Sequence, residues 1–376
     1  MKFRSLFLSA LCGLAVSTAF TSCSDDEYDP YEYGSSVALP EHRGLVLNEG
    51  SYTLNNTSIS FFDAAKDTTT KAANDLFLIQ NKKQLGDTGQ DIIAEDNNIY
   101  VSVYGSSYVA KLNKAGVEQA RMAFGNDLGQ PRYMAECDGY IYVTTYGGYV
   151  VKLNANDLSV VAKVTVGKAA ERIDEEDGIL YVACGNTTDY VPDNRMFIID
   201  TKNFTDSAVK SVDVCDNTQL VRASDKYVFI QGYGADWTNT PFWVYDIKSG
   251  KAEDTGLFAT YAIATRDDNK AFAIYSKTEW FSTDNNEWYS VTENSYFIYD
   301  AATKTKSDFT SKITSAAPEL ANASIYALSE GENGSFYITT TLYSAGNGTV
   351  YHFDSNYNLL GSFTSWGQNP KKVVVM

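Results

Sequence analysis

The chain has 376 residues, with 47 aspartates and glutamates against 30 lysines and arginines, and a formal net charge of −17. Such an acidic protein is poorly suited to sequence-independent binding of nucleic acid or anionic lipid, since both need clustered positive charge. Only two histidines are present, His42 and His352, and no catalytic triad, histidine-rich metal site or dinucleotide fingerprint can be assembled convincingly. We therefore expect no enzymatic activity, metal or cofactor.

The first residues have the pattern of an export signal. Residues 6–19 form an apolar stretch after a short basic start, too short to span a bilayer, so residues 1–22 are interpreted as a signal peptide. A small residue before Cys23 resembles a bacterial lipobox, and the acidic residues 24–27 resemble the export signal of Bacteroidota surface lipoproteins. The simpler alternatives are cleavage beside a free cysteine and a solvated acidic tether. Residues 23–43 are polar and predict a lipidated linker.

A repeated strand-turn-strand pattern organises residues 44–376. Its clearest copy is residues 141–154, IYVTTYGGYVVKLN, where Gly147 and Gly148 supply the positive φ of a tight hairpin between β-branched and aromatic flanks. Seven such copies end in Asn or Asp, at positions 63, 113, 154, 200, 246, 300 and 354. Repeats of about this length built only of strands are typical of propeller blades. The sequence therefore predicts an all-β, seven-bladed β-propeller.

Further strands complete each repeat. One lies upstream, as in residues 90–101, and one downstream, as in residues 158–167 with its alternating apolar side chains, which gives four strands per blade. The first copy, from residue 44, lacks an upstream strand, whereas residues 371–376 form an upstream strand with no copy after it. We therefore predict that these two segments pair and that both termini close the first blade, which removes the exposed edges of an open sheet array.

One face of such a propeller collects the loops inside the repeats and the loops that enter the innermost strands. The loops inside the repeats are long and aromatic, and the longest is residues 277–294. Alignment of the repeats places polar residues where the innermost strands begin, including Glu171 and Gln219. The candidate ligand-binding residues are Tyr52, Asp87, Gln90, Arg132, Tyr190, Tyr233, Trp237, Trp280 and Trp288. The simpler alternatives are aromatic packing within blades, expected for Tyr100, Tyr142 and Tyr181, and polar groups satisfied by water.

Several motifs resemble a known family. Residues 47–51, 56–63, Asn81, 85–90 and 131–133 are similar to the YncE-type propeller lipoproteins of Bacteroidota. That family includes BtuG-like surface proteins that capture cobalamin. The resemblance implies a corrinoid ligand, a lipid anchor in the outer membrane and transfer to a TonB-dependent transporter. The loops at residues 180–200 and 280–288 do not match the cobalamin binders.

Three other functions remain open. A surface glycan binder would use the loop tryptophans to stack on sugar faces. A carboxylate-dependent polysaccharide lyase or hydrolase would need a carboxylate pair, which spacing does not identify in so acidic a chain. A purely structural surface protein is also compatible with the fold. The cysteines outside residues 1–23, Cys137, Cys184 and Cys215, are expected to be small buried side chains without a disulfide framework.

Overall fold

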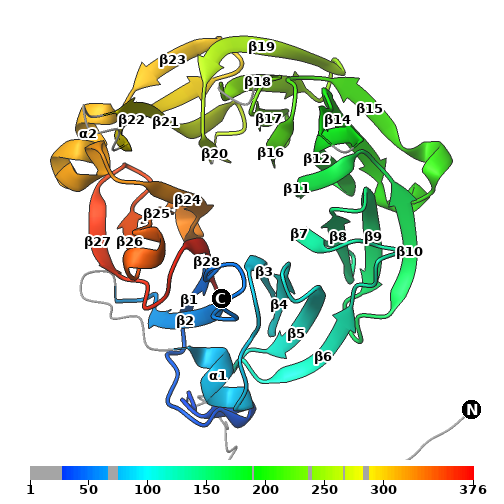
Figure 1. Ribbon diagram of the computed structural model, residues 1–376, viewed down its shortest axis with the longest axis vertical. Coiled ribbons are helices and arrows are strands. Elements are labelled where there is room, and N and C mark those ends of the chain that lie inside the picture. The colour runs from blue at the N-terminus through cyan, green and yellow to red at the C-terminus, as the bar shows by residue number, and fades with distance from the viewer. Residues whose placement is uncertain (1–27, 67–74, 189, 236–238, 266, 283–287) are drawn as a thin grey trace, which may run out of the picture.

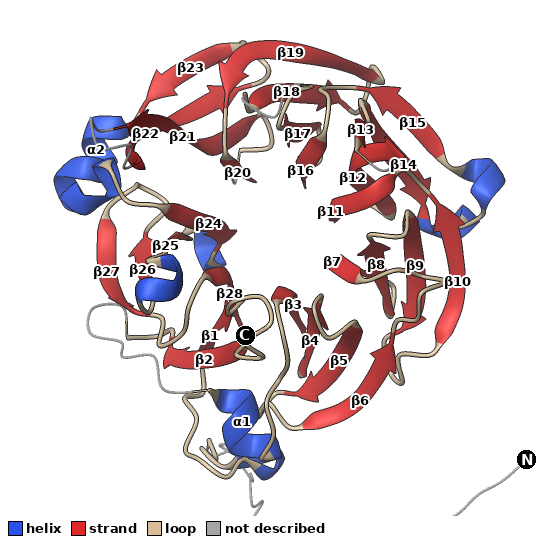
Figure 2. Cartoon of the chain, viewed as in Figure 1, coloured by secondary structure: helices blue, strands red, loops and turns tan. Residues whose placement is uncertain are grey.

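The computed structural model describes residues 28–66, 75–188, 190–235, 239–265, 267–282 and 288–376. Seven antiparallel sheets stand around a central opening, and strands dominate over the few short helices (Figures 1 and 2). The prediction of a seven-bladed β-propeller is confirmed. The segment interpreted as a signal peptide and Cys23 lie outside the described residues.

Each blade presents its innermost strand to the channel, and these strands contact one another around the ring. The innermost strands are β3 (Gly89–Glu95), β7 (Pro131–Cys137), β11 (Lys168–Glu176), β16 (Thr218–Ala223), β20 (Tyr261–Ala264), β24 (Ile325–Glu330) and β28 (Pro370–Val375). The second strands are β4 (Asn98–Val103), β8 (Tyr140–Thr145), β12 (Ile179–Thr188), β17 (Tyr227–Gly232), β21 (Lys270–Ser282), β25 (Phe336–Thr340) and β1 (Arg43–Asn48).

The third and fourth strands complete the blades outward. The third strands are β5 (Tyr108–Asn113), β9 (Tyr149–Asn154), β14 (Arg195–Asp200), β18 (Pro241–Asp246), β22 (Trp288–Asp300), β26 (Thr349–Phe353) and β2 (Ser58–Asp63). The fourth strands are β6 (Glu118–Ala123), β10 (Val160–Thr165), β15 (Lys210–Asp213), β19 (Lys251–Phe258), β23 (Thr305–Asp308) and β27 (Leu359–Thr364), and the short β13 (Val191–Pro192) pairs with β12.

The helices are short and lie between strands. The α-helices are α1 (Leu76–Asn81) and α2 (Thr310–Ala316), and the 3-10 turns are η1 (Glu32–Gly34), η2 (Thr201–Asn203), η3 (Asp206–Ala208), η4 (Pro318–Ala321), η5 (Glu332–Gly334) and η6 (Tyr343–Ala345). No helix within the described ranges is both long and apolar enough to cross a bilayer.

The first blade is closed by both ends of the chain, as the sequence predicts. β1 pairs with β28 in an antiparallel register that sets Gly44 opposite Val375 and Val46 opposite Val373. In this blade the described residues form three strands, β2, β1 and β28, and α1 contacts β2. Figure 1 shows α1 at the periphery beside this sheet.

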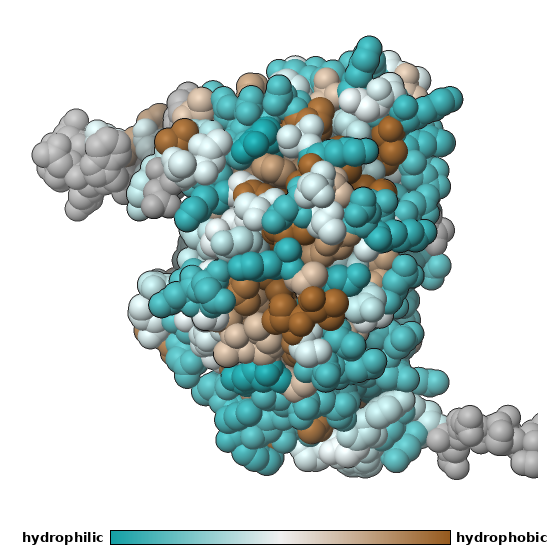
Figure 3. Space-filling view, turned by 90° about the vertical axis from the view of Figure 1, so that its right-hand side faces the viewer, coloured by the Kyte–Doolittle hydropathy of each residue, from teal (hydrophilic) through white to brown (hydrophobic). Residues whose placement is uncertain are grey.

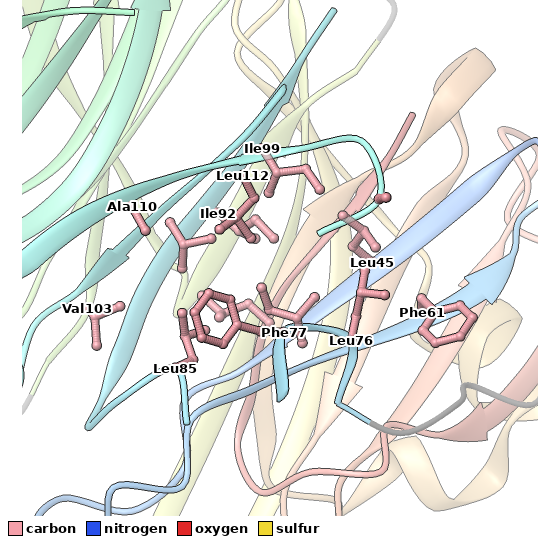
Figure 4. Close-up of a cluster of buried hydrophobic side chains, with 14 of the residues drawn as sticks. Leu45, Phe61, Leu76, Phe77, Leu85, Ile92, Ile99, Val103, Ala110 and Leu112 are labelled. Carbon is pink, nitrogen blue, oxygen red and sulfur yellow. The ribbon is translucent and has the colours of Figure 1, made fainter. Parts of the chain in front are cut away.

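Apolar side chains fill the space between neighbouring blades. Between the first and second blades, Leu45 and Ile92 are fully buried together with Leu76 and Phe77 of α1 (Figure 4). Full burial of each such side chain stabilises the fold by about 1.5–3 kcal/mol before the cost of ordering the chain is subtracted. The aromatic packing expected of Tyr142 and Tyr181 is confirmed by their contacts with Phe204 and Tyr245. Tyr100 is buried without a ring contact of this kind among the described residues, and the burial expected of the three free cysteines is confirmed.

The folded body begins earlier than residue 44. Within the segment interpreted as a linker, Leu39 is buried in the cluster between the first two blades. The fully buried Arg43 donates hydrogen bonds to Glu32 Oε1 at 2.6 Å and to the Pro40 carbonyl at 2.6 Å. The polar, tyrosine-rich composition concealed this packing because only a few apolar residues carry it. Residues 28–42 are therefore part of the ring's surface.

The segment 277–294, expected as a loop, is instead largely strand in its described part. β21 and β22 continue past the length of the other blades, from Lys270 opposite Asp300 to Ser282 opposite Trp288. The cause is the run of β-branched and aromatic residues along both arms, which favours strand pairing over an irregular loop. The result is a long hairpin that extends the sixth blade.

The direction of the innermost strands defines two faces of the ring. We call the face where these strands begin the entry face, and it also carries the connections between the second and third strands of each blade. We call the opposite one, which carries the tight turns after the first and third strands, the exit face. On the side that carries β10, the wall between the faces is mostly hydrophilic, with several apolar areas of which the largest lies near the middle of the view (Figure 3). Val160 and Val161 of β10 are exposed on this wall.

Candidate functional site

Exposed apolar side chains gather on the entry face. Among the described residues, thirteen of the eighteen large apolar side chains that are exposed lie on its loops, strand ends or long hairpin. These thirteen, which we call the entry rim, are Tyr52, Leu54, Tyr146, Tyr190, Val191, Tyr233, Phe258, Trp280, Phe281, Val291, Leu342, Tyr343 and Trp366. Exposed apolar side chains scattered singly need no explanation, but such a concentration on one face makes that face the candidate site.

Inside this rim, the start of the channel holds a buried network centred on Arg132. Its guanidinium donates to Glu171 Oε2 from Nη2 at 2.6 Å and from Nε at 3.1 Å, and to Gln90 Oε1 from Nη1 at 2.6 Å. Gln90 and Glu171 are buried. Burial alone would lower the pKa of Arg132, but the Glu171 carboxylate, together with Tyr133 and Tyr146, raises it overall. The network therefore holds a fixed positive charge beside a fixed negative one.

Three tyrosine rings surround the Arg132 guanidinium. Its central carbon lies 5.0 Å from the ring centroid of Tyr104, 5.5 Å from that of Tyr146 and 5.7 Å from that of Tyr133. Tyr104 and Tyr146 also contact each other edge to face at 5.8 Å between centroids. These distances are within the range of cation–π attraction. The rings hold the arginine in place and connect the ionic network to the entry rim.

A second ionic network lies on the entry face where the first blade meets the seventh, between the end of β1 and the starts of β28 and β24. Glu49 Oε2 accepts hydrogen bonds from Lys371 Nζ at 2.8 Å and from the Tyr326 hydroxyl at 2.6 Å. Burial raises the pKa of Tyr326, and the Glu49 carboxylate raises it further, so the hydroxyl stays protonated and donates. Electrostatic interaction with Arg132 and Tyr133 places Lys371 near the first network. The channel mouth thus presents two carboxylates, each held by a cation.

One polar group at the mouth has no partner. Gln90 is 1% exposed, and its carboxamide oxygen accepts from Arg132, but its Nε2 has no hydrogen-bond partner among the described residues. A buried donor left unsatisfied costs about 1–3 kcal/mol. It is therefore a position where a ligand carbonyl or a water would be stabilised.

The structure brings together some predicted residues and separates others. Gln90 and Arg132 touch, as predicted, and Glu171 joins them. Asp87 instead holds a loop, since its Oδ2 accepts from the Thr53 backbone at 2.9 Å. Gln219 does not join the Arg132 network, and its Nε2 donates to Asn217 Oδ1 at 2.7 Å.

The predicted aromatic residues lie farther out on the entry face. The entry rim contains Tyr52, Tyr190, Tyr233 and Trp280, which are 69%, 89%, 40% and 67% exposed. Burial raises the pKa of Tyr233, with further contributions from Tyr133 and Glu171, so its hydroxyl is near the channel mouth. Trp237 lies outside the described residues. Trp288 is placed only by its backbone, opposite Ser282.

Sequence reasoning missed Glu49, Tyr326 and Lys371. A signal for two of them was present, because five innermost strands carry a polar or aromatic residue at their second position. These residues are Gln90, Arg132, Gln219, Tyr326 and Lys371. The dipeptides Pro131-Arg132 and Pro370-Lys371 repeat the same proline-cation pair at the start of β7 and β28. Glu49 had no such marker, since it only follows the end of β1.

No protein-family model and no curated protein matches the chain. Solved structures do resemble it. A quinoprotein alcohol dehydrogenase-like protein from Bacteroides thetaiotaomicron is 13% identical with a TM-score of 0.56, over 88% of this chain and 77% of that one. A functionally unknown protein from Desulfotomaculum acetoxidans is 10% identical with a TM-score of 0.56, over 89% and 98%. Hydrazine synthase from Kuenenia stuttgartiensis is 15% identical with a TM-score of 0.53, over 69% and 74%. At these identities the likeness concerns the fold alone.

Proposed function

We propose that this propeller is a non-catalytic binding protein that captures its ligand on the entry face, over the mouth of the channel. The carrying observation is the concentration of exposed apolar side chains around a mouth that offers fixed charges and one unsatisfied donor, Gln90 Nε2. Binding sites commonly combine apolar surface with a few placed polar groups in this way. Glu49 and Glu171 are both held by cations, an arrangement that favours binding over acid-base catalysis.

A corrinoid such as cobalamin is the ligand class we favour. The reason for this choice is the resemblance of the first repeats to the YncE-type lipoproteins. A corrinoid is broad, flat and edged with amide groups, so its faces suit the aromatic side chains of the entry rim and its amides suit the polar mouth. The proposal includes lipidation at Cys23, a place on the outer face of the outer membrane and transfer to a TonB-dependent transporter.

A surface glycan is the second candidate. The observation that favours it is the exposure of Tyr190, Trp280 and Trp366, which are 89%, 67% and 49% exposed, because exposed aromatic rings can stack on the apolar faces of sugars. A signal on a glycan array that is lost in Trp280→Ala would support it.

Calorimetric titration of the lipid-free chain from Ser24 onward with cyanocobalamin tests the first candidate. We expect saturable binding by the wild type. The affinity should be at least about tenfold lower in a Trp280→Ala/Trp366→Ala variant, the loss typical of aromatic anchors. Val160→Ala/Val161→Ala on the outer wall is the matched control and should bind as the wild type does. Absence of heat and of thermal stabilisation in the wild type contradicts the corrinoid proposal.

A further inference from the structure

Below the mouth described above, a pocket lies deeper in the channel, toward the exit face. It has a volume of about 380 Å³ and is enclosed by five innermost strands, β3, β7, β11, β16 and β28. Its polar or aromatic wall residues include Asp91, Tyr133, Arg172, Asp174, Arg222 and Lys372. Pockets of this size are large enough for a small metabolite.

Two arginines in this pocket have no acidic partner. Arg172 is 9% exposed, and its guanidinium carbon lies 4.5 Å from the ring centroid of Tyr133. Within the described part of the chain, neither Arg172 nor Arg222 forms an ion pair or a side-chain hydrogen bond, and Arg222 Nε is buried without a partner. Burial lowers the pKa of Arg172, and the neighbouring Arg222 lowers it further. The carboxylates of Asp91 and Asp174 oppose this effect without forming an ion pair with either arginine, so both guanidinium groups lack an anion in direct contact.

Two carboxylates of the same pocket, those of Asp91 and Asp174, are already engaged. Asp91 accepts from Lys372 Nζ at 2.8 Å and from the Met134 backbone at 2.9 Å. Asp174 Oδ2 accepts from the Ala223 backbone at 2.8 Å. These carboxylates therefore fix the local backbone and Lys372, and their hydrogen bonds do not extend to the arginines.

Glu136 and Glu175, which line the same pocket nearer the exit face, are engaged in the same way. Glu136 Oε1 accepts from the Gly139 backbone at 2.8 Å, and Glu175 Oε1 accepts from the Gly178 backbone at 2.6 Å, so both stabilise exit-face turns. Glu330 interacts electrostatically with Arg222, but no ion pair joins the two. Glu95 also lines the pocket at its exit-face end and forms no ion pair within the described ranges. The uncommitted groups of the pocket are therefore the two guanidinium groups and this one carboxylate.

We propose that this pocket is a second binding site, which takes the carboxylate or phosphate group of a small molecule between Arg172 and Arg222. The planar guanidinium presents parallel N–H donors that match two oxygens of either group. A buried cation without a partner is costly, and an anion between two of them removes both costs together. This site is separate from the entry-face function, because Tyr133 stands between Arg132 and Arg172.

Titration of the lipid-free chain from Ser24 onward with sodium phosphate, and separately with sodium acetate, tests this site. Ionic strength is held constant with sodium chloride, so that general screening does not change. We expect at least one of the two anions to bind saturably by calorimetry and to raise Tm. Arg172→Gln and Arg222→Gln should each weaken that binding about tenfold or more, because each removes a charge-assisted contact. The stronger of the two anions identifies the ligand group.

Two controls make the result decisive. Arg121→Gln, on the outer strand β6 and paired with Glu118, should leave anion binding unchanged, as should Trp280→Ala on the entry face. In chloride alone, Arg172→Gln should have a Tm equal to or above that of the wild type, because it removes a buried charge that has no ion-pair partner. Saturation by neither anion overturns the proposal, and so does a clear fall in Tm for Arg172→Gln in chloride, which would assign the arginine a structural role. Cyanocobalamin binding is scored separately, so either proposal can fail alone.

Discussion

The two faces of the ring are built from the same repeats but carry opposite chemistry. On the exit face, tight turns place Asp96, Asp138 and Asp177 at φ of 52°, 52° and 51°, a left-handed conformation that aspartate tolerates better than most residues. On the entry face, longer connections carry the apolar side chains of the entry rim. The comparison teaches that the exit turns mainly stabilise the fold and add negative charge to that face. The entry connections vary in length and carry the candidate site.

The largest effect on stability is expected from Arg132→Ala at the entry face. The substitution leaves the buried Glu171 carboxylate without its cation, and removal of one partner of a buried pair costs about 3–5 kcal/mol. Chemical denaturation measures the loss in the free energy of unfolding. Arg121→Ala breaks an ion pair on the outer strand and should cost less than about 1 kcal/mol. Equal losses in the two variants would show that the entry network does not stabilise the ring.

A smaller effect is expected from Glu176 at the exit face, and it depends on pH. Burial raises the pKa of Glu176 to about 7, and a hydrogen bond with Asp225 adds to the shift. Because the folded-state pKa lies above the ordinary value of 4.5, the folded protein binds the proton more tightly, and stability declines as pH rises from about 4.5 to about 7.

Glu176→Gln removes this titration and keeps the hydrogen-bonding shape. The variant should match the wild type near pH 4.5 and exceed it above pH 7, by at most about 1 kcal/mol, since the group is largely accessible to solvent screening. Thermal unfolding across this pH range measures the difference. If Tm depends on pH in the same way in the two proteins, the raised pKa of Glu176 and its hydrogen bond with Asp225 do not affect stability.

The smallest effect on stability is expected at the entry rim. Trp366 is 49% exposed, so Trp366→Ala should change the free energy of unfolding by less than about 0.5 kcal/mol, even though it contributes to the proposed ligand surface. A fully buried residue such as Leu45 provides the contrast, because Leu45→Ala should cost about 2–5 kcal/mol. A loss of more than about 2 kcal/mol in the free energy of unfolding of Trp366→Ala would show that the Trp366 indole packs in the core of the fold and not on a binding surface.

Most of the fold could be predicted because the same strand pattern recurs in seven repeats. The pairing of β1 with β28 followed from one repeat without an upstream strand and one upstream strand without a repeat. The packing of Leu39 and Arg43 could not, because it depends on single residues within a polar segment and on partners distant in sequence, such as Lys114, whose carbonyl accepts from Arg43 at 3.0 Å.

The candidate site could be predicted only in part, for a related reason. Position within the repeat identified Gln90 and Arg132, because the start of each innermost strand recurs at a fixed place. Glu49 and the pair Arg172 and Arg222 became visible only once the ring set strands from different blades side by side. Long-range pairing of charges leaves no periodic trace in a sequence, whereas strand alternation does.

The closure of the first blade also has a consequence for how the protein folds. β1 and β28 are separated by more than 300 residues, so their pairing forms only when almost the whole chain is present. Contacts between distant segments slow folding, because a large loop must close first. Until β28 arrives, one edge of β1 is an unpaired strand edge open to other chains. A chain shortened by its last six residues is therefore expected to aggregate during folding more readily than one that has lost a surface loop.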